Sequence, residues 1–269
     1  MVIIAERINA TRKRIANALA KRNAAQIKKE VRSQAQAGAS YIDLNAGSVP
    51  EKEVANLCWL VEITQESTEL PICVDSANPE ALSAALKLIK NPDVIVNSIN
   101  GEKERIEKVL PLAAEHNTKL IGLTMDESGL PSTVEARLAI TGKMVEAAAR
   151  VGVGVERLFI DPCIHPLSTS PDQPLAAQEA VRKIKADYPG IKTTCGLSNA
   201  SFGLPYRSII NRVYVTMMLE AGLDSAVLDP TEPDMRATIL AAEALLGKDE
   251  YCMNYIMAER GGHLRPESK

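Results

Sequence analysis

Carboxylate and amide side chains recur along the chain, each a few residues after a short apolar segment. Eight such segments occur in the 269 residues, and every one is followed by Asp, Asn or Glu. The polar residues at these positions are Glu6, Asn9, Asp43, Asn45, Asp75, Asn97, Asn100, Asp126, Asp161, Asn199 and Asp229. A carboxylate accepts two parallel hydrogen bonds from an adjacent N–H and NH2 pair, and an amide both donates and accepts. The set therefore suits a flat heterocycle rich in hydrogen-bond donors, such as a pterin or a purine.

A structural role is the alternative for each of these residues, because Asp and Asn also begin turns and cap helices. Ser and Thr would cap equally well, so the recurrence at all eight positions favours a shared function. Other chemistries have less support. The histidines are His116, His165 and His263, and no two are spaced as a metal-binding pair, so we expect no metal ligand set. A carboxylate site for Mg²⁺ or Mn²⁺ stays open.

The apolar segments are typical of strands in a parallel sheet, because they are continuous rather than alternating. The predicted strands are Val2–Ala5, Tyr41–Leu44, Ile72–Val74, Val94–Val96, Lys119–Leu123, Leu158–Ile160, Lys192–Gly196 and Ser225–Leu228. A segment with helical spacing follows each strand. The predicted helices are Arg22–Ala37, Glu51–Glu66, Pro79–Ile89, Lys103–His116, Val134–Val151, Pro174–Tyr188, Ser208–Glu220 and Asp234–Leu245.

Eight strand–helix units predict an α/β protein with the (β/α)8 TIM-barrel fold in a single domain. A doubly wound open sheet is the alternative. Residues 1–257 are assigned to the barrel and residues 258–269 to a polar C-terminal tail, and no linker divides the chain. In such barrels the active site lies at the C-terminal ends of the strands. We therefore expect the Asp and Asn side chains to meet there.

Composition excludes several other classes. The net charge is −3 with both signs evenly mixed, so we expect neither nucleic-acid binding nor membrane binding. The five cysteines are widely spaced and contain no C-x-x-C pair, which favours reduced thiols over a zinc or redox site. The first apolar stretch is too short for a signal peptide, and no segment approaches the roughly 20 residues of a membrane span. We expect a cytoplasmic protein.

Seven motifs at the strand ends together resemble one family. They are Glu6-Arg7-Ile8-Asn9, Asp43-Leu44-Asn45, Val74-Asp75-Ser76, Asn97-Ser98-Ile99-Asn100, Ile121-Gly122-Leu123-Thr124-Met125, Ile160-Asp161-Pro162 and Gly196-Leu197-Ser198-Asn199. In this order they resemble the pterin-binding methyltransferases that move a methyl group between methyltetrahydrofolate and a corrinoid protein. The resemblance is strongest to the stand-alone barrels: those serving the corrinoid iron–sulfur protein, and those of anaerobic methylamine-type and glycine betaine demethylation systems.

The resemblance implies roles for individual residues. Asp75, Asn97 and Asp161 are expected to hydrogen-bond the pyrimidine side of the pterin. Asn199 is expected beside N5, the atom that carries the methyl group, as the catalytic residue of an SN2 transfer. The remaining candidates are Gly196 and Ser198, which would shape the loop around the pterin, Arg207 near the ring or its glutamate tail, and Glu6, Asn9, Asp43 and Asn45 as possible contacts.

The resemblance also implies partners. The folate is the substrate, and the corrinoid (methylcobalamin when methylated) is expected on a separate protein, because this chain has no histidine motif to ligate cobalt. The family tends to form homodimers.

Two other functions stay open. One is a dihydropteroate synthase, which resembles the chain at Asn9, Asp75 and Asn97, but whose Arg-x-His at strand 8 is replaced here by Asp229-Pro230. That family's strand 7 lysine is also missing from this chain. The other alternative is a folate-binding protein without catalysis.

Overall fold

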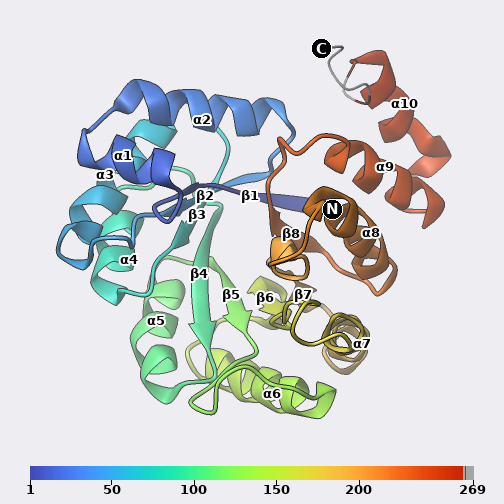
Figure 1. Ribbon diagram of the computed structural model, residues 1–269. Coiled ribbons are helices and arrows are strands. Elements are labelled where there is room, and N and C mark those ends of the chain that lie inside the picture. Colours follow the sequence, from blue (N-terminus) through green and yellow to red (C-terminus); the bar gives the residue numbers. More distant parts are fainter. Residues whose placement is uncertain (263, 265–269) are drawn as a thin grey trace.

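Eight parallel strands form a ring at the centre of the molecule, and helices surround it (Figure 1). The structure is a computed structural model that describes residues 1–262 and 264. Its strands are β1 (Val2–Asn9), β2 (Tyr41–Asn45), β3 (Ile72–Asp75), β4 (Val94–Asn100), β5 (Lys119–Leu123), β6 (Leu158–Asp161), β7 (Lys192–Thr193) and β8 (Ser225–Leu228). They hydrogen-bond in the order β7-β6-β5-β4-β3-β2-β1-β8. The expected (β/α)8 barrel is confirmed.

The ring closes between β7 and β8 by a few backbone contacts. The amide of Val227 donates to the carbonyl of Cys195 at 2.8 Å, and Gly196 forms an isolated bridge with Val227. The prediction of a strand reaching Gly196 was wrong, since regular pairing with β6 ends at Thr193. Beyond that point the backbone turns toward β8, and the Gly196 amide donates to the Asp161 side chain at 3.1 Å instead of to a strand carbonyl.

The helices are α1 (Lys13–Ala20), α2 (Ala24–Gln36), α3 (Glu53–Gln65), α4 (Pro79–Leu86), α5 (Lys103–Glu115), α6 (Val134–Arg150), α7 (Gln173–Asp187), α8 (Arg207–Glu220), α9 (Met235–Leu245) and α10 (Met253–Arg260). Eight of them follow the prediction to within a few residues. No helix in the described part of the chain is both long enough and apolar enough to cross a membrane.

Two helices were not predicted from the sequence. α1 is separated from α2 by Arg22, whose φ of 48° interrupts helical geometry. α2 therefore starts at Ala24 rather than Arg22, and the Asn23 side chain caps it by accepting from the Gln26 amide at 3.1 Å. α10 extends through residues 258–260, which had been assigned to the polar tail. Residues 263 and 265–269 of that tail lie outside the described residues.

Candidate functional site at the C-terminal strand ends

The pleat of the strands explains how polar side chains come to face the inside of the barrel. One apolar cluster lies inside the barrel, on the N-terminal side of the polar side chains. It has one buried residue from each of six strands: Ile4, Tyr41, Cys73, Ile95, Ile121 and Phe159. Side chains on a strand alternate between its faces, so the residue two positions later points inward as well. On five of the six strands that residue is Glu6, Asp43, Asp75, Asn97 or Asp161, and on β5 it is Leu123. A polar layer thus covers the apolar one at the C-terminal end.

Neighbouring members of this layer are paired by hydrogen bonds. Asn45 donates from Nδ2 to Oδ2 of Asp75 at 3.0 Å, and Asn97 donates from Nδ2 to Oδ1 of Asp43 at 3.4 Å. Asp75 lies opposite Asn45 on one side and Asn97 on the other in the strand register. Within the described residues, Oδ1 of Asp75 and the side-chain carbonyl of Asn97 accept no hydrogen bond. These two acceptors are available to a ligand.

The two carboxyl groups of this cluster both have raised pKa values. Burial raises the pKa of Asp75 to about 6, although Asn45 and the Arg105 guanidinium favour its charged form. Burial and the neighbouring Asp75 charge raise the pKa of Asp43 well above its ordinary value. Two adjacent buried carboxylates repel each other, so a charge on Asp75 favours the protonated form of Asp43. With a pKa of about 6, Asp75 is mostly ionised at neutral pH.

Asp161 shapes the backbone on the opposite side of the barrel. Its Oδ1 accepts from the Cys163 amide at 2.7 Å, and its Oδ2 accepts from the Gly196 amide at 3.1 Å. Burial raises the pKa of Asp161 to about 6, against the effect of these two bonds and of the Arg137 charge. Asp161 is thus ionised at neutral pH, and each oxygen keeps a second lone pair.

The loop after β7 carries Ser198 and Asn199 on a short 3-10 turn over residues 197–199. Asn199 is exposed, and its side-chain amide forms no hydrogen bond within the part of the chain that the structure describes. A Cβ atom at Gly196 would lie 2.9 Å from Asn199 Nδ2, so a larger residue there would make the amide shift. In the observed position the Asn199 amide is available to a ligand.

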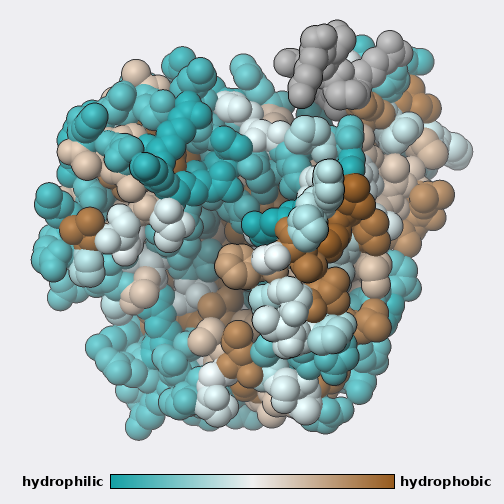
Figure 2. Space-filling view, viewed as in Figure 1, coloured by the Kyte–Doolittle hydropathy of each residue, from teal (hydrophilic) through white to brown (hydrophobic). Residues whose placement is uncertain are grey.

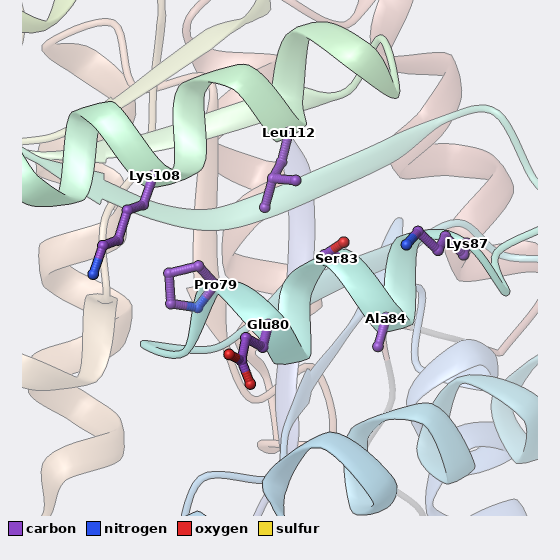
Figure 3. Close-up of a pocket in the computed structure, with 7 residues that line it drawn as sticks. All are labelled: Pro79, Glu80, Ser83, Ala84, Lys87, Lys108 and Leu112. Atoms are coloured by element: carbon purple, nitrogen blue, oxygen red, sulfur yellow. The ribbon is translucent and has the colours of Figure 1, made fainter.

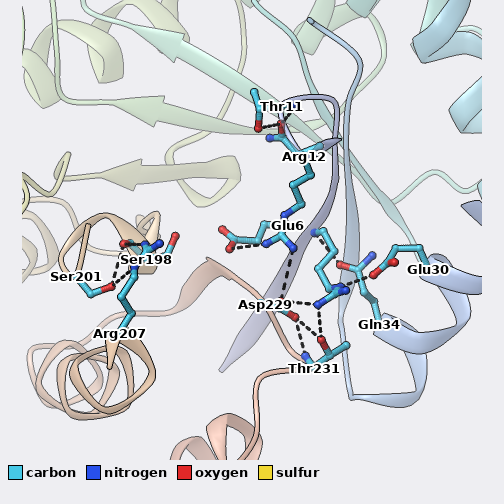
Figure 4. Close-up of polar contacts among 12 residues, drawn as sticks. Glu6, Thr11, Arg12, Glu30, Gln34, Ser198, Ser201, Arg207, Asp229 and Thr231 are labelled. Atoms are coloured by element: carbon cyan, nitrogen blue, oxygen red, sulfur yellow. Dashed lines mark hydrogen bonds and ion pairs between the residues drawn. The ribbon is translucent and has the colours of Figure 1, made fainter. Parts of the chain in front are cut away.

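The side chain of Arg207 binds the loop after β7. It donates from Nη2 to the Ser198 carbonyl at 2.6 Å and from Nε to the Ser201 hydroxyl at 3.0 Å. In Figure 4 the carboxylate of Glu6 points toward the side on which Ser198 and Arg207 lie. Burial raises the pKa of Glu6, while the charges of Arg12 and Arg207 oppose that rise.

Asn9 differs from the other candidates, because its side chain is used locally. Its Oδ1 accepts from the amide of Thr11 at 3.0 Å and from the Thr11 hydroxyl at 2.7 Å. Asp126 makes the same kind of turn with Ser128, and Asn100 accepts from the Glu102 amide at 3.0 Å. For these three residues the turn and capping role accounts for the observed bonds.

A network around Arg7 and Arg12 was not anticipated from the sequence. Arg7 binds Glu30 and donates from Nη1 to Oδ2 of Asp229 at 2.8 Å (Figure 4). Arg12 Nη2 lies 3.6 Å from Glu6 Oε1, and Arg12 Nη1 lies 3.8 Å from Asp229 Oδ2. The network ties β1, α2 and the loop after β8 together. Arg7 lies in the Glu6-Arg7-Ile8-Asn9 motif, so the sequence marked its position. Its partner Asp229 is 222 positions away, and local spacing cannot predict such a pair.

The surface also has a groove between two helices. A groove of about 370 Å³ between α4 and α5 is lined by Pro79, Glu80, Ser83, Ala84, Lys87, Lys108 and Leu112 (Figure 3). None of these residues belongs to the polar layer. Among residues 1–262 and 264, no three His, Cys, Asp or Glu side chains form a group that could hold a metal ion.

Comparisons of sequence agree with a pterin site. Residues 5–229 match the profile of a family described as "Pterin binding enzyme". A methylcorrinoid:tetrahydrofolate methyltransferase from Eubacterium limosum is 41% identical over 268 residues, which cover 99% of this chain and 98% of that protein. A methionine synthase from Mycobacterium tuberculosis is 32% identical over 209 residues, which cover 73% of this chain but 17% of that longer protein.

Solved structures with the same fold include dihydropteroate synthases. The Yersinia pestis enzyme, bound to a pterine-sulfa conjugate, has a TM-score of 0.72 at 14% identity and covers 92% of this chain and 93% of its own. The Xanthomonas albilineans enzyme in complex with 7,8-dihydropteroate has a TM-score of 0.67 at 19% identity, covering 93% of each chain. At this level of identity the likeness concerns the fold alone.

Proposed function

The chain belongs to the family of pterin-binding enzymes, and we propose that it moves a methyl group between N5 of tetrahydrofolate and the cobalt of a corrinoid on a separate protein. The observation that carries this function is the 41% identity to the Eubacterium limosum methyltransferase, which spans almost the full length of both chains. The matched 268 residues include every strand end from which the site is built. A dihydropteroate synthase has support from the fold alone, and a folate carrier would not need the free amide of Asn199.

Three residues are proposed to hold the pyrimidine ring of the pterin. Asp75 is ionised and has a free oxygen, so it accepts the paired N–H and NH2 donors of the ring. Asn97 offers its carbonyl from the adjacent strand. Asp161 accepts from the other ring nitrogens through its remaining lone pairs. Burial around these groups strengthens each of their hydrogen bonds.

Asn199 is proposed to contact N5 during the transfer. In the direction toward cobalt, the cobalt(I) electron pair forms the new cobalt–carbon bond, the carbon–N5 bond breaks, and its electrons remain on N5, which takes up a proton. A neutral amide can accept a hydrogen bond from protonated N5 through its oxygen and turn away when N5 is methylated. An interaction that strengthens in the transition state raises the rate. Gly196 and the Arg207-bound carbonyl of Ser198 keep the amide in place.

The test is methyl transfer from methyltetrahydrofolate to cobalamin, followed by the absorption spectrum of cobalt. We expect Asn199→Ala to slow transfer by about 10²- to 10³-fold, the usual effect of removing one such polar contact. Gly196→Ala should slow transfer as well, because its Cβ displaces the Asn199 amide. Asn17→Ala, an exposed amide on α1, is the control and should transfer at the wild-type rate. Wild-type protein that transfers no methyl group would overturn the function, and full activity of Asn199→Ala would remove that residue from the site.

A homodimer is proposed from the apolar surface near the C-terminus. Large apolar side chains of α9, α10 and their connection are exposed, among them Leu245 at 86%, Tyr251 at 84% and Met257 at 58%. Figure 2 has brown, hydrophobic side chains gathered over the side of the molecule formed by α8, α9 and α10. Contiguous apolar patches on a protein surface mark contact sites, and a second copy of the chain would cover this one.

A cytoplasmic location and a role in anaerobic metabolism are proposed from the chemistry. The five cysteines form no disulfide, which agrees with a reducing compartment. Cobalt(I) is a strong reductant that oxygen consumes, so a transfer that depends on it needs anoxic conditions.

A further inference from the structure

Two arginines lie behind the candidate pterin site and hold the backbone of its loops. Arg105 belongs to the first turn of α5. It donates from Nε to the Ser98 carbonyl at 2.8 Å, and from Nη1 and Nη2 to the carbonyls of Ala77 and Ser76, each at 2.6 Å. One side chain thus fastens the loop after β3 to the end of β4.

Arg137 does the same on the opposite side of the barrel. It belongs to the first turn of α6 and is fully buried. It donates from Nε to the Pro162 carbonyl at 2.7 Å and from Nη2 to the Cys163 carbonyl at 3.4 Å. Gln173 accepts from the same Nη2 at 3.0 Å, which fixes the guanidinium in turn.

Three of the carbonyls that these arginines bind belong to a residue that directly follows a proposed pterin contact. The pairs are Asp75 and Ser76, Asn97 and Ser98, and Asp161 and Pro162. Buried carbonyls need partners, and loop carbonyls have none in a sheet ladder. The guanidinium supplies several donors in one rigid plane, which a lysine cannot do.

We propose that Arg105 and Arg137 are positioning residues of the pterin site, each fixing the loop backbone beside the side chains that bind the ligand. This role rests on the proposed function. Neither arginine is among the proposed ligand contacts, so each acts through the residue next to the carbonyl it binds. Sites for small molecules require such support, because contacts displaced by about 1 Å lose much of their effect.

The positive charges have a second effect, on ionisation. Arg105 lowers the pKa of Asp75 against the effect of burial, and the other titratable groups around that carboxylate are Asp43, Glu53 and Cys73. Arg137 likewise favours ionised Asp161, which faces the titratable groups Cys163, Cys195 and Tyr214. Without its arginine, each carboxyl group would have a higher pKa and would keep its proton up to a higher pH.

The test compares the affinity for methyltetrahydrofolate between pH 5 and 9 in wild-type protein, Arg105→Gln and Arg105→Lys. Binding needs ionised Asp75, so wild-type affinity should fall as pH drops through about 6. In Arg105→Gln we expect affinity at least about tenfold lower at pH 7.5, with the fall moved to higher pH. Arg105→Lys keeps the charge but cannot bind three carbonyls. It should bind weakly with the wild-type pH midpoint.

Arg157 provides a matched control at the other end of the barrel. It donates from Nε to the Thr118 carbonyl at 2.9 Å and from Nη2 to the Ala113 carbonyl at 2.8 Å, where β5 and β6 begin. Arg157→Gln loses the same type of bond and should lower the thermal midpoint of unfolding, while the affinity for methyltetrahydrofolate and its pH dependence stay as in wild type.

The outcomes separate this role from the proposed function. Wild-type protein that does not bind methyltetrahydrofolate overturns the function and the positioning role with it. Wild-type binding together with unchanged affinity in Arg105→Lys overturns the positioning role alone, and so does an Arg157→Gln variant that loses as much affinity as Arg105→Gln. Where Arg105→Gln does not fold, the Arg105→Lys measurement decides.

Discussion

The carboxylates that make the site useful also reduce the stability of the fold. Asp75 has an ordinary pKa of 3.8 that burial raises to about 6. The folded protein therefore binds this proton more tightly than the unfolded chain does. Its contribution to stability is complete below about pH 4 and is lost as pH rises through 6. Each pKa unit corresponds to 1.36 kcal/mol, so ionised Asp75 costs at most about 3 kcal/mol at neutral pH.

Replacing Asp75 by Asn should remove that cost together with ligand binding. We expect Asp75→Asn to be about 2 kcal/mol more stable than wild type at pH 8, with the difference shrinking as pH falls below 6 and vanishing below about pH 4, and to bind methyltetrahydrofolate weakly. Urea unfolding at several pH values measures both curves. Asp126→Asn is the control with the opposite sign, because hydrogen bonds from Ser128 lower the pKa of Asp126. A stability difference for Asp75→Asn that does not change with pH would contradict this account.

At the scale of secondary structure, the alternation of strands was visible in the sequence because buried parallel strands are continuously apolar. The inward-facing layer was also implicit there. In β2 the residues Tyr41, Asp43 and Asn45 fall two apart, and the pleat alone puts them on one face. The spacing could not separate them from Asn9 or Asp126, because the choice between a turn and a ligand contact depends on how one side chain rotates.

Other elements depended on contacts that sequence patterns do not contain. The break at Arg22 rests on a left-handed backbone in a residue type that rarely adopts it. β7 ends at Thr193, and beyond it the Gly196 amide donates to the Asp161 side chain rather than to a strand carbonyl. The role of Arg105 was invisible because its carbonyl partners lie on the loop after β3 and at the end of β4, 7 to 29 positions away. Long-range side-chain bonds to the backbone follow from the packed fold rather than from local spacing.

The contact between β7 and β8, where the barrel closes, should open more readily than the other strand pairs. β7 pairs with β6 at two residues, whereas β4 pairs with β5 at five. Local opening follows the number of backbone bonds that must break. We expect the amides of Thr194 and Val227 to exchange with deuterium faster than those of β3 and β4, and methyltetrahydrofolate to slow them, because its proposed contacts include Asp161 and Asn199. Equal protection around the ring, or no effect of ligand, would contradict the prediction.

At the scale of the whole molecule, α10 is the α-helix with the fewest buried residues in the part of the chain that the structure describes. It has eight residues, and of these only Ala258 is buried. Isolated helices shorter than about 12 residues are marginal in water, and α10 packs mainly against α9. Met253, Ile256 and Met257 are exposed on it at 50%, 38% and 58%. A second copy that covers these side chains would stabilise the helix as well as the assembly.

The dimer prediction follows from this packing. We expect wild-type protein at micromolar concentration to have the mass of a dimer in light scattering after gel filtration. Met257→Lys should shift it to monomer, because a charge buried in an apolar interface without a partner is strongly unfavourable. Leu88→Lys, at an apolar side chain exposed to 38% beyond the end of α4, is the control and should stay dimeric. A monomeric wild type, or a dimeric Met257→Lys, would contradict the interface. Methyl transfer should persist in the monomer, since the candidate site is built from one chain alone.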